Sequence, residues 1–144
     1  MKAKTVTEEP YGILHSMTQS EAVSHWQQRA RSELKAARVL FESNDRNLYG
    51  EVIFHCHLAS ELALKAKYIQ EHDTAAPFTH SLGKLAEMLD ETWSEDDRID
   101  FDQLTDHAVL SRYGDEKWYG EHATKESAEK WLTKVEKLLT KIQP

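Results

Sequence analysis

The feature of this 144-residue sequence that most constrains the fold is a broad apolar stripe between residues 49 and 69. Apolar side chains recur there at three- and four-residue steps, which is the period of an α-helix: Tyr49, Val52, Ile53, Cys56, Ala59, Ala63, Ala66 and Ile69. The stripe is widened by four more apolar side chains, Phe54, Leu58, Leu62 and Leu64. A helix that is apolar around so much of its circumference needs neighbours on more than one side. We therefore expect a central helix inside a bundle.

Four further segments have the same periodicity and complete the expected bundle: residues 20–42, 79–91, 100–110 and 124–142. Ser20 and Thr124 are the expected N-caps of the first and last of these helices. The chain has only five glycines and three prolines, so it has few turn residues, which disfavours an all-β fold. The prediction is an all-α fold, an antiparallel four-helix bundle with an additional short helix. Residues 1–18 are expected to form a flexible N-terminal arm, and residues 19–144 a single helical domain.

Composition limits where such a protein works and what it binds. Cys56 is the only cysteine, which excludes an intrachain disulfide and favours a reducing compartment. The first 17 residues lack the apolar stretch of a signal peptide, and no window reaches the length of a membrane-spanning helix. We expect a cytoplasmic protein without a membrane partner. The net charge of −7 argues against a general nucleic-acid-binding surface, so any contact with a polyanion must be local.

Four short patterns follow one another along the chain. They are Trp26…Ala30…Glu33-Leu34, then Tyr49…Phe54 continued by Ala59-x-Glu61-x-Ala63-Leu64-Lys65-Ala66, then His80-x-Leu82-x-x-Leu85, and last Arg112-Tyr113. In this order and spacing they resemble the helices of the HEPN family, over roughly residues 20–142. The resemblance implies a four-to-five-helix bundle that is often a homodimer. It also implies either a partner of a minimal nucleotidyltransferase, toxin–antitoxin pairs included, or a metal-independent ribonuclease.

The ribonuclease branch of that family carries an arginine, four to six residues and then a histidine. In this chain Arg112 is followed by no histidine in that window, and the first one is His122. Six residues separate Arg112 from Tyr119, and a tyrosine with a pKa near 10 is a poor base at neutral pH. In some transferase-paired members a tyrosine replaces the histidine and is modified by the partner. The interpretation therefore leans away from an enzyme, and the catalytic residues stay unassigned.

The candidate site for a nucleotide, RNA or a partner protein consists of five residues: Arg112, Tyr113, Tyr119, His80 and Lys65. A phosphate contact from Arg112 and base stacking on Tyr113 are the functional interpretation. The alternative is that Arg112 caps the carbonyls at the end of its helix while Tyr113 packs against the last helix. For Lys65, an ion pair with Glu61 at i,i+4 spacing is favoured over a phosphate contact.

No cofactor or metal is expected. His55 and His57 point about 200° apart on a helix and cannot share one ion. Two other functional classes stay open beside the leading hypothesis of a partner-dependent HEPN-like protein. One is an endoribonuclease in which Arg112 acts with an unusual base, for which three histidines are candidates: His80, His107 and His122. The other is a protein–protein interaction module that docks through the acidic run at residues 87–106.

Overall fold

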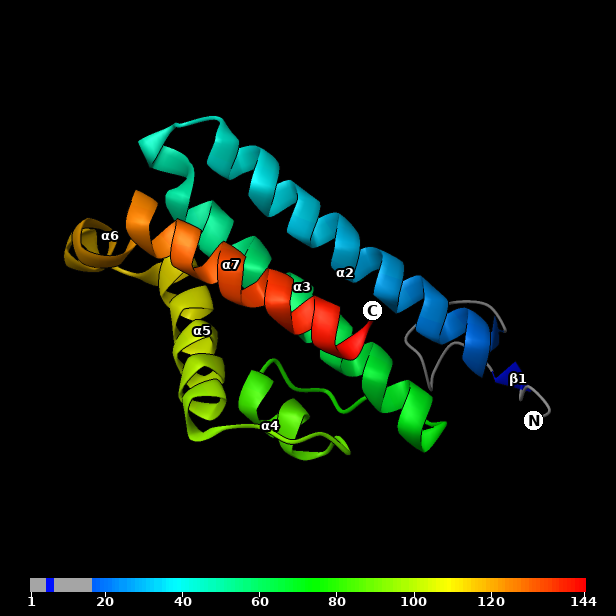
Figure 1. The fold of residues 1–144 in the computed structure, drawn as a ribbon. Helices are drawn as coiled ribbons and strands as arrows, with labels where there is room; N and C mark the ends of the chain where they lie inside the picture. Colours follow the sequence, from blue (N-terminus) through cyan, green and yellow to red (C-terminus); the bar gives the residue numbers. More distant parts are fainter. Residues whose placement is uncertain (1–4, 7–16) are drawn as a thin grey trace.

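The computed structural model describes residues 5–6 and 17–144, and its helices are organised around α3 (Tyr49–His72). α3 contacts α2 (Gln19–Glu42), α7 (Lys125–Ile142), α5 (Glu95–Tyr113) and α4 (Leu82–Glu87). In Figure 1, α2, α3 and α7 lie side by side along one direction, and α5 is steeply inclined to them. The predicted all-α fold and central helix are confirmed.

The core follows from the breadth of the apolar stripe on α3. Val52, Ile53 and Leu64 have no solvent exposure and belong to the main hydrophobic cluster. Cys56 is buried with them, and burial raises the pKa of its thiol, so it behaves as a small apolar side chain as predicted. α7 closes the cluster with Trp131, which is 2% exposed. Loss of water contact by these side chains is the main force that holds α2, α5 and α7 on α3.

Two helix starts differ from the sequence-based expectation because side-chain caps set them. α2 begins after Thr18, not Ser20, since the Thr18 hydroxyl accepts the Glu21 amide at 3.1 Å while Glu21 bonds back to the Thr18 amide at 3.1 Å. α5 begins after Ser94, well before the predicted start near residue 100. The same reciprocal box joins Ser94 and Asp97 there. Carboxylates in this first turn favour the positive end of the helix dipole.

Two short helices complete the architecture. α4 is shorter than the predicted helix at 79–91 and starts at a Ser81 cap. α6 (Glu116–His122) was not predicted, and the Asp115 side chain caps it by accepting the Trp118 amide at 3.0 Å. A 3₁₀ turn at Arg46–Leu48 (η1) leads into α3, and α7 begins after Thr124 as predicted.

The N-terminal segment contributes one small pairing. Thr5–Val6 (β1) pairs antiparallel with Met17–Thr18 (β2), and Met17 is buried in a small cluster with Ala22 and Ile69. The rest of the predicted flexible arm, residues 1–4 and 7–16, lies outside the described residues.

Candidate functional site

A groove of about 390 Å³ between α3 and α5 brings together three of the five predicted site residues, His80, Arg112 and Tyr113. We call it the Arg112 groove. The other residues that line it are Phe54, His57, Leu58 and Glu61 of α3 and Thr105, Ala108 and Val109 of α5.

Arg112 is placed by α3 and not by the end of its own helix. Its guanidinium carbon lies 3.7 Å from the centroid of the Phe54 ring, and its Nη1 donates to Glu51 Oε1 at 3.3 Å. The arginine side chain is 40% exposed. A guanidinium that lies over an aromatic ring and uses one N–H for an ion pair retains further N–H donors, which can bind a phosphate or a carboxylate. Arg112 therefore does not cap the last carbonyls of α5.

The ring of Tyr113 is exposed to solvent. It is 86% exposed and does not pack against α7. The turn that follows requires glycine, because a β-carbon at Gly114 would collide with the Leu110 carbonyl. The Gly114 amide donates to that same carbonyl at 2.7 Å and ends the helix there. An exposed aromatic ring beside a guanidinium is an arrangement that can stack a nucleobase.

Glu61 is the polar centre of the groove. Its carboxylate is only 8% exposed, and it accepts from Lys65 Nζ at 2.9 Å and faces His80 Nδ1 at 3.0 Å. The His80 side chain is 85% exposed. A carboxylate that accepts from Nδ1–H fixes the orientation of an imidazole and leaves Nε2 available to take up a proton.

His57 locks the loop that carries His80. Its Nε2–H donates to the backbone carbonyl of His80 at 2.9 Å. Burial lowers the pKa of His57, and the hydrogen bond to that carbonyl and the Glu61 charge act in the opposite direction. His57 is therefore a neutral structural histidine at neutral pH. His55 points elsewhere and binds Glu33 at 2.6 Å, so the two rings have different partners, as their helical spacing predicts.

The remaining two predicted site residues lie outside the groove lining. Lys65 forms the i,i+4 ion pair with Glu61 that the sequence favoured. Tyr119 lies on α6, where its hydroxyl donates to the Ser111 carbonyl and its ring packs against Gly50 at the start of α3. Tyr119 is thus anchored beside the groove and not within it.

The other two histidines considered as bases occupy a different hollow. Its lining includes His107, His122, Trp118 and Lys130, and it shares no residue with the Arg112 groove. Trp118 Nε1 donates to His107 Nδ1 at 3.2 Å. The centroids of the His107 and His122 rings are 5.0 Å apart. Burial, helped by the nearby His122 and Lys130 charges, lowers the pKa of His107. Neither the His107 ring nor the His122 ring lies in the groove with Arg112.

Sequence reasoning missed two contributors to the groove. Phe54 was assigned to the apolar stripe, but it is the platform beneath Arg112. Glu61 was paired with Lys65 alone, whereas it also holds His80 from 19 residues away. The sequence did contain a sign that Glu61 has a second partner, because an acidic residue inside an otherwise apolar helix needs more than one partner to be buried.

The family model described as the HEPN domain matches residues 23–143. Comparison with curated proteins and with solved structures found no match. None of the described helices has the length and apolar character needed to span a membrane.

Proposed function

The chain belongs to the HEPN domain family, and from that membership we propose that its Arg112 groove binds a nucleotide or a short stretch of RNA without cutting it. The observation that carries the proposal is the pairing of a guanidinium stacked on Phe54 with the exposed ring of Tyr113. Arg112 contacts a phosphate and Tyr113 stacks a base. Because the protein is acidic overall, binding is confined to this groove and weakens as salt rises.

We further propose that the protein acts as a homodimer together with a minimal nucleotidyltransferase. Support for the dimer comes from apolar surface in the lining of the groove, where Val109 is 56% exposed and Tyr113 is 86% exposed. Exposed apolar side chains that adjoin one another mark contact surfaces. Support for the transferase is the family resemblance of the sequence, and a short reading frame of that type beside the gene would strengthen it.

A second candidate function is favoured by one contact. Glu61 orients His80 through Nδ1, and both line the groove with Arg112. In that arrangement His80 Nε2 takes the 2′-hydroxyl proton of RNA as the 2′-oxygen bonds to the adjacent phosphorus, and Arg112 stabilises the charge on the phosphorus centre. The bond from phosphorus to the 5′-oxygen then breaks, and the 5′-oxygen leaves with a proton from water. This is a metal-independent endoribonuclease that uses His80, and neither His107 nor His122, as its base.

One experiment separates the two functions. A labelled single-stranded RNA is titrated with the protein in the presence of EDTA, and both fluorescence anisotropy and RNA length are followed. We expect binding with intact RNA, and a loss of affinity of about tenfold or more in Arg112→Ala, because a charge-assisted hydrogen bond contributes roughly 1.5–3 kcal/mol. Arg38→Ala is the matched control, since Arg38 is a similarly exposed arginine that pairs with Glu136 on another face.

The outcomes are distinct. Cleavage that disappears in both Arg112→Ala and His80→Ala would establish the ribonuclease instead. An equal effect of Arg38→Ala and Arg112→Ala would assign the binding to general charge and contradict the groove. Absence of binding to RNA and to mononucleotides alike would reject both functions for this surface.

A further inference from the structure

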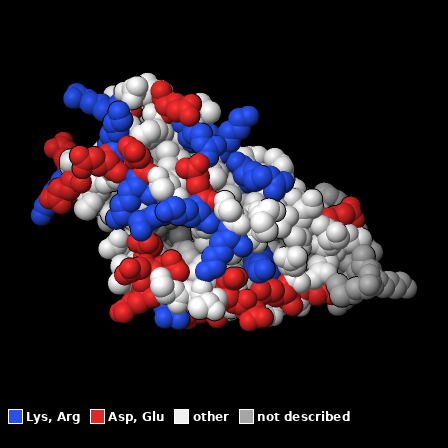
Figure 2. Space-filling model, viewed as in Figure 1, with Lys and Arg blue, Asp and Glu red and all other residues white. Residues whose placement is uncertain are grey.

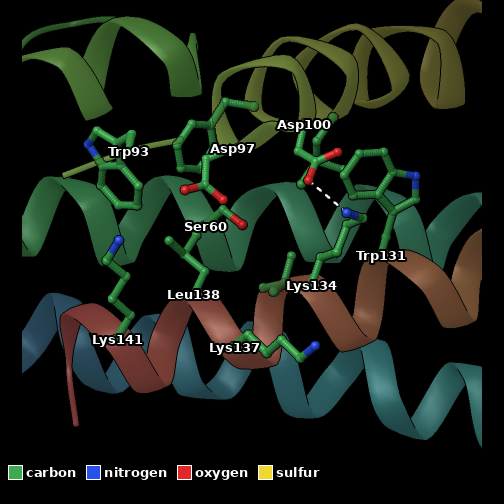
Figure 3. A pocket seen from close by; sticks show the side chains of 12 residues that line it. Ser60, Trp93, Asp97, Asp100, Trp131, Lys134, Lys137, Leu138 and Lys141 are labelled. Carbon is green, nitrogen blue, oxygen red and sulfur yellow. Dashed lines mark hydrogen bonds and ion pairs between the residues drawn. The ribbon is translucent and has the colours of Figure 1, made fainter. Parts of the chain in front are cut away.

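A third cavity lies between α5 and α7, and it is independent of the proposed function. Its volume is about 240 Å³, and none of its lining residues belongs to the Arg112 groove. Figure 3 shows α5 above it, α7 below it and Trp93 at one end, with Ser60 of α3 behind. We call it the α5–α7 cleft.

Apolar side chains form most of the walls of the α5–α7 cleft. They belong to Trp93, Phe101, Leu104, Trp131, Val135 and Leu138. The Trp93 and Phe101 rings meet edge to face with centroids 5.1 Å apart. Trp93 Nε1 donates to the Ala86 carbonyl at 2.9 Å, so the indole is fixed and has no free donor. Water that lies against these apolar walls, away from the charged rim, finds few hydrogen-bond partners, which favours its replacement by an apolar group.

The rim carries two carboxylates that are already compensated. Asp100 Oδ2 accepts from Lys134 Nζ at 2.7 Å, the contact drawn as a dashed line in Figure 3. Asp97 Oδ2 accepts the Ser94 amide at 2.9 Å and lies in the first turn of α5, where the helix dipole favours a negative charge. Neither carboxylate therefore needs a cationic ligand.

The rim also carries two ammonium groups without a carboxylate partner among the described residues. Lys141 Nζ donates to the neutral Thr92 carbonyl at 2.7 Å and lies 4.4 Å from the centre of the Trp93 ring. Lys137 is exposed and forms no ion pair with a described residue. In Figure 3, Lys141 points toward Trp93 and Lys134 toward Asp100, while Lys137 points toward neither. On the face drawn in Figure 2, basic side chains gather across the middle of this otherwise acidic protein.

We propose that the α5–α7 cleft binds a small aromatic carboxylate, with its ring between Trp93 and Trp131 and its charge toward Lys137 and Lys141. The size fits, because an apolar cavity of about 150 Å³ holds a single benzene ring, and 240 Å³ leaves room for two fused rings. A whole nucleotide is larger than the cleft. Ring burial supplies most of the affinity, and the two ammonium groups select an anion over a neutral ring.

The test uses 2-naphthoate as the probe and its neutral analogue 2-naphthamide as the comparison. The indole N–H signals are followed by ¹⁵N NMR, with Trp93 assigned from Trp93→Phe. We expect a saturable shift of the Trp93 signal with naphthoate, little change at the distant Trp26, and weaker binding of the amide. We expect Lys137→Ala to weaken naphthoate binding about fivefold. A single pair of opposite charges at contact distance in water changes a binding constant by about that factor.

Lys125→Ala is the matched control, because Lys125 is exposed on the same helix but does not line the cleft. It leaves naphthoate binding unchanged, and so does Arg112→Ala, which separates this proposal from RNA binding in the groove. Equal affinity of naphthoate and naphthamide would overturn the proposal, and so would an unshifted Trp93 signal at millimolar probe. An equal loss in Lys125→Ala and Lys137→Ala would overturn the assignment of the anion to this rim.

Discussion

The two faces of α5 differ in how far they expose their titratable side chains to solvent. His107 and Arg112 are five residues apart, so their side chains leave the helix about 140° apart. On the His107 face, Trp118 of α6 packs against the imidazole and donates to it. On the Arg112 face, the guanidinium lies on Phe54 and the neighbouring Tyr113 is in solvent. One helix therefore separates a face where an imidazole is half-buried against α6, which we call the closed face, from a more exposed one, which we call the open face.

The difference shows that environment, more than residue type, decides which histidine can act on a ligand. An indole N–H only donates, so His107 must accept through Nδ1 and must be neutral to keep that bond. His80, in contrast, is held through Nδ1 by Glu61 while most of its side chain stays exposed. We therefore place the proposed contact with an external ligand on the open face, and we expect the closed face to stabilise the fold.

The largest expected effect is on the closed face. Trp118 is 7% exposed and attaches α6 to α5 through His107. We expect Trp118→Ala to lower the free energy of unfolding by about 3 kcal/mol, because it deletes a buried aromatic ring and a hydrogen bond. Urea unfolding followed by circular dichroism measures this loss.

The matched variant on the open face is Tyr113→Ala. The ring it removes is exposed, so we expect a change within about 0.5 kcal/mol of the wild type. RNA binding should respond in the opposite order, with Tyr113→Ala weakened more than Trp118→Ala. Similar stability losses in the two variants would mean that the faces do not differ as described.

A smaller effect is expected when the pH is lowered. Burial lowers the pKa of His107 from its ordinary value of 6.5, with His122 and Lys130 acting in the same direction and Asp106 against it. The unfolded chain then binds a proton before the folded one does. The stability due to neutral His107 is complete above pH 6.5 and is lost as the pH falls below it, toward the lower folded pKa.

His107→Gln isolates this contribution, because the amide oxygen can accept from Trp118 and does not titrate. Denaturant unfolding at pH 7.5 and at pH 5.5 gives the loss for each protein. We expect a smaller loss on acidification for His107→Gln than for the wild type, with His57 and the carboxylates supplying the remainder. Equal losses would show that His107 is not held in its neutral form.

The sequence predicted the parts of this structure that repeat an apolar period over many residues. The central helix and the start of α7 at Thr124 were confirmed, since each buries a long stripe. The start of α5 was placed too late, because its first turn is acidic and the Ser94 cap leaves no apolar signal. α6 was missed because only Trp118 is buried along its seven residues.

Most residues of the candidate site could be predicted from the sequence, but their arrangement in space could not. The family pattern led to Arg112, Tyr113 and His80, which the structure gathers in one groove. It also led to Tyr119, which α6 carries against Gly50 instead. Pairing of Glu61 with His80 joins positions 19 residues apart, and no local period encodes such a contact.

The smallest expected effect concerns how α6 is held on the closed side, and it compares two glycines. A β-carbon at Gly50 would lie 3.2 Å from Tyr119 Cε1, whereas one at Gly120 would meet nothing within 4 Å. Both glycines are helical, so replacement by alanine gains up to about 1 kcal/mol of helix propensity at either position. Gly120→Ala should show that gain in urea unfolding. Gly50→Ala should fall short of it, because the tyrosine ring must shift to admit the methyl group. If the two variants gain equally, the Tyr119 ring moves aside without cost, and its packing against Gly50 does not hold α6 in place.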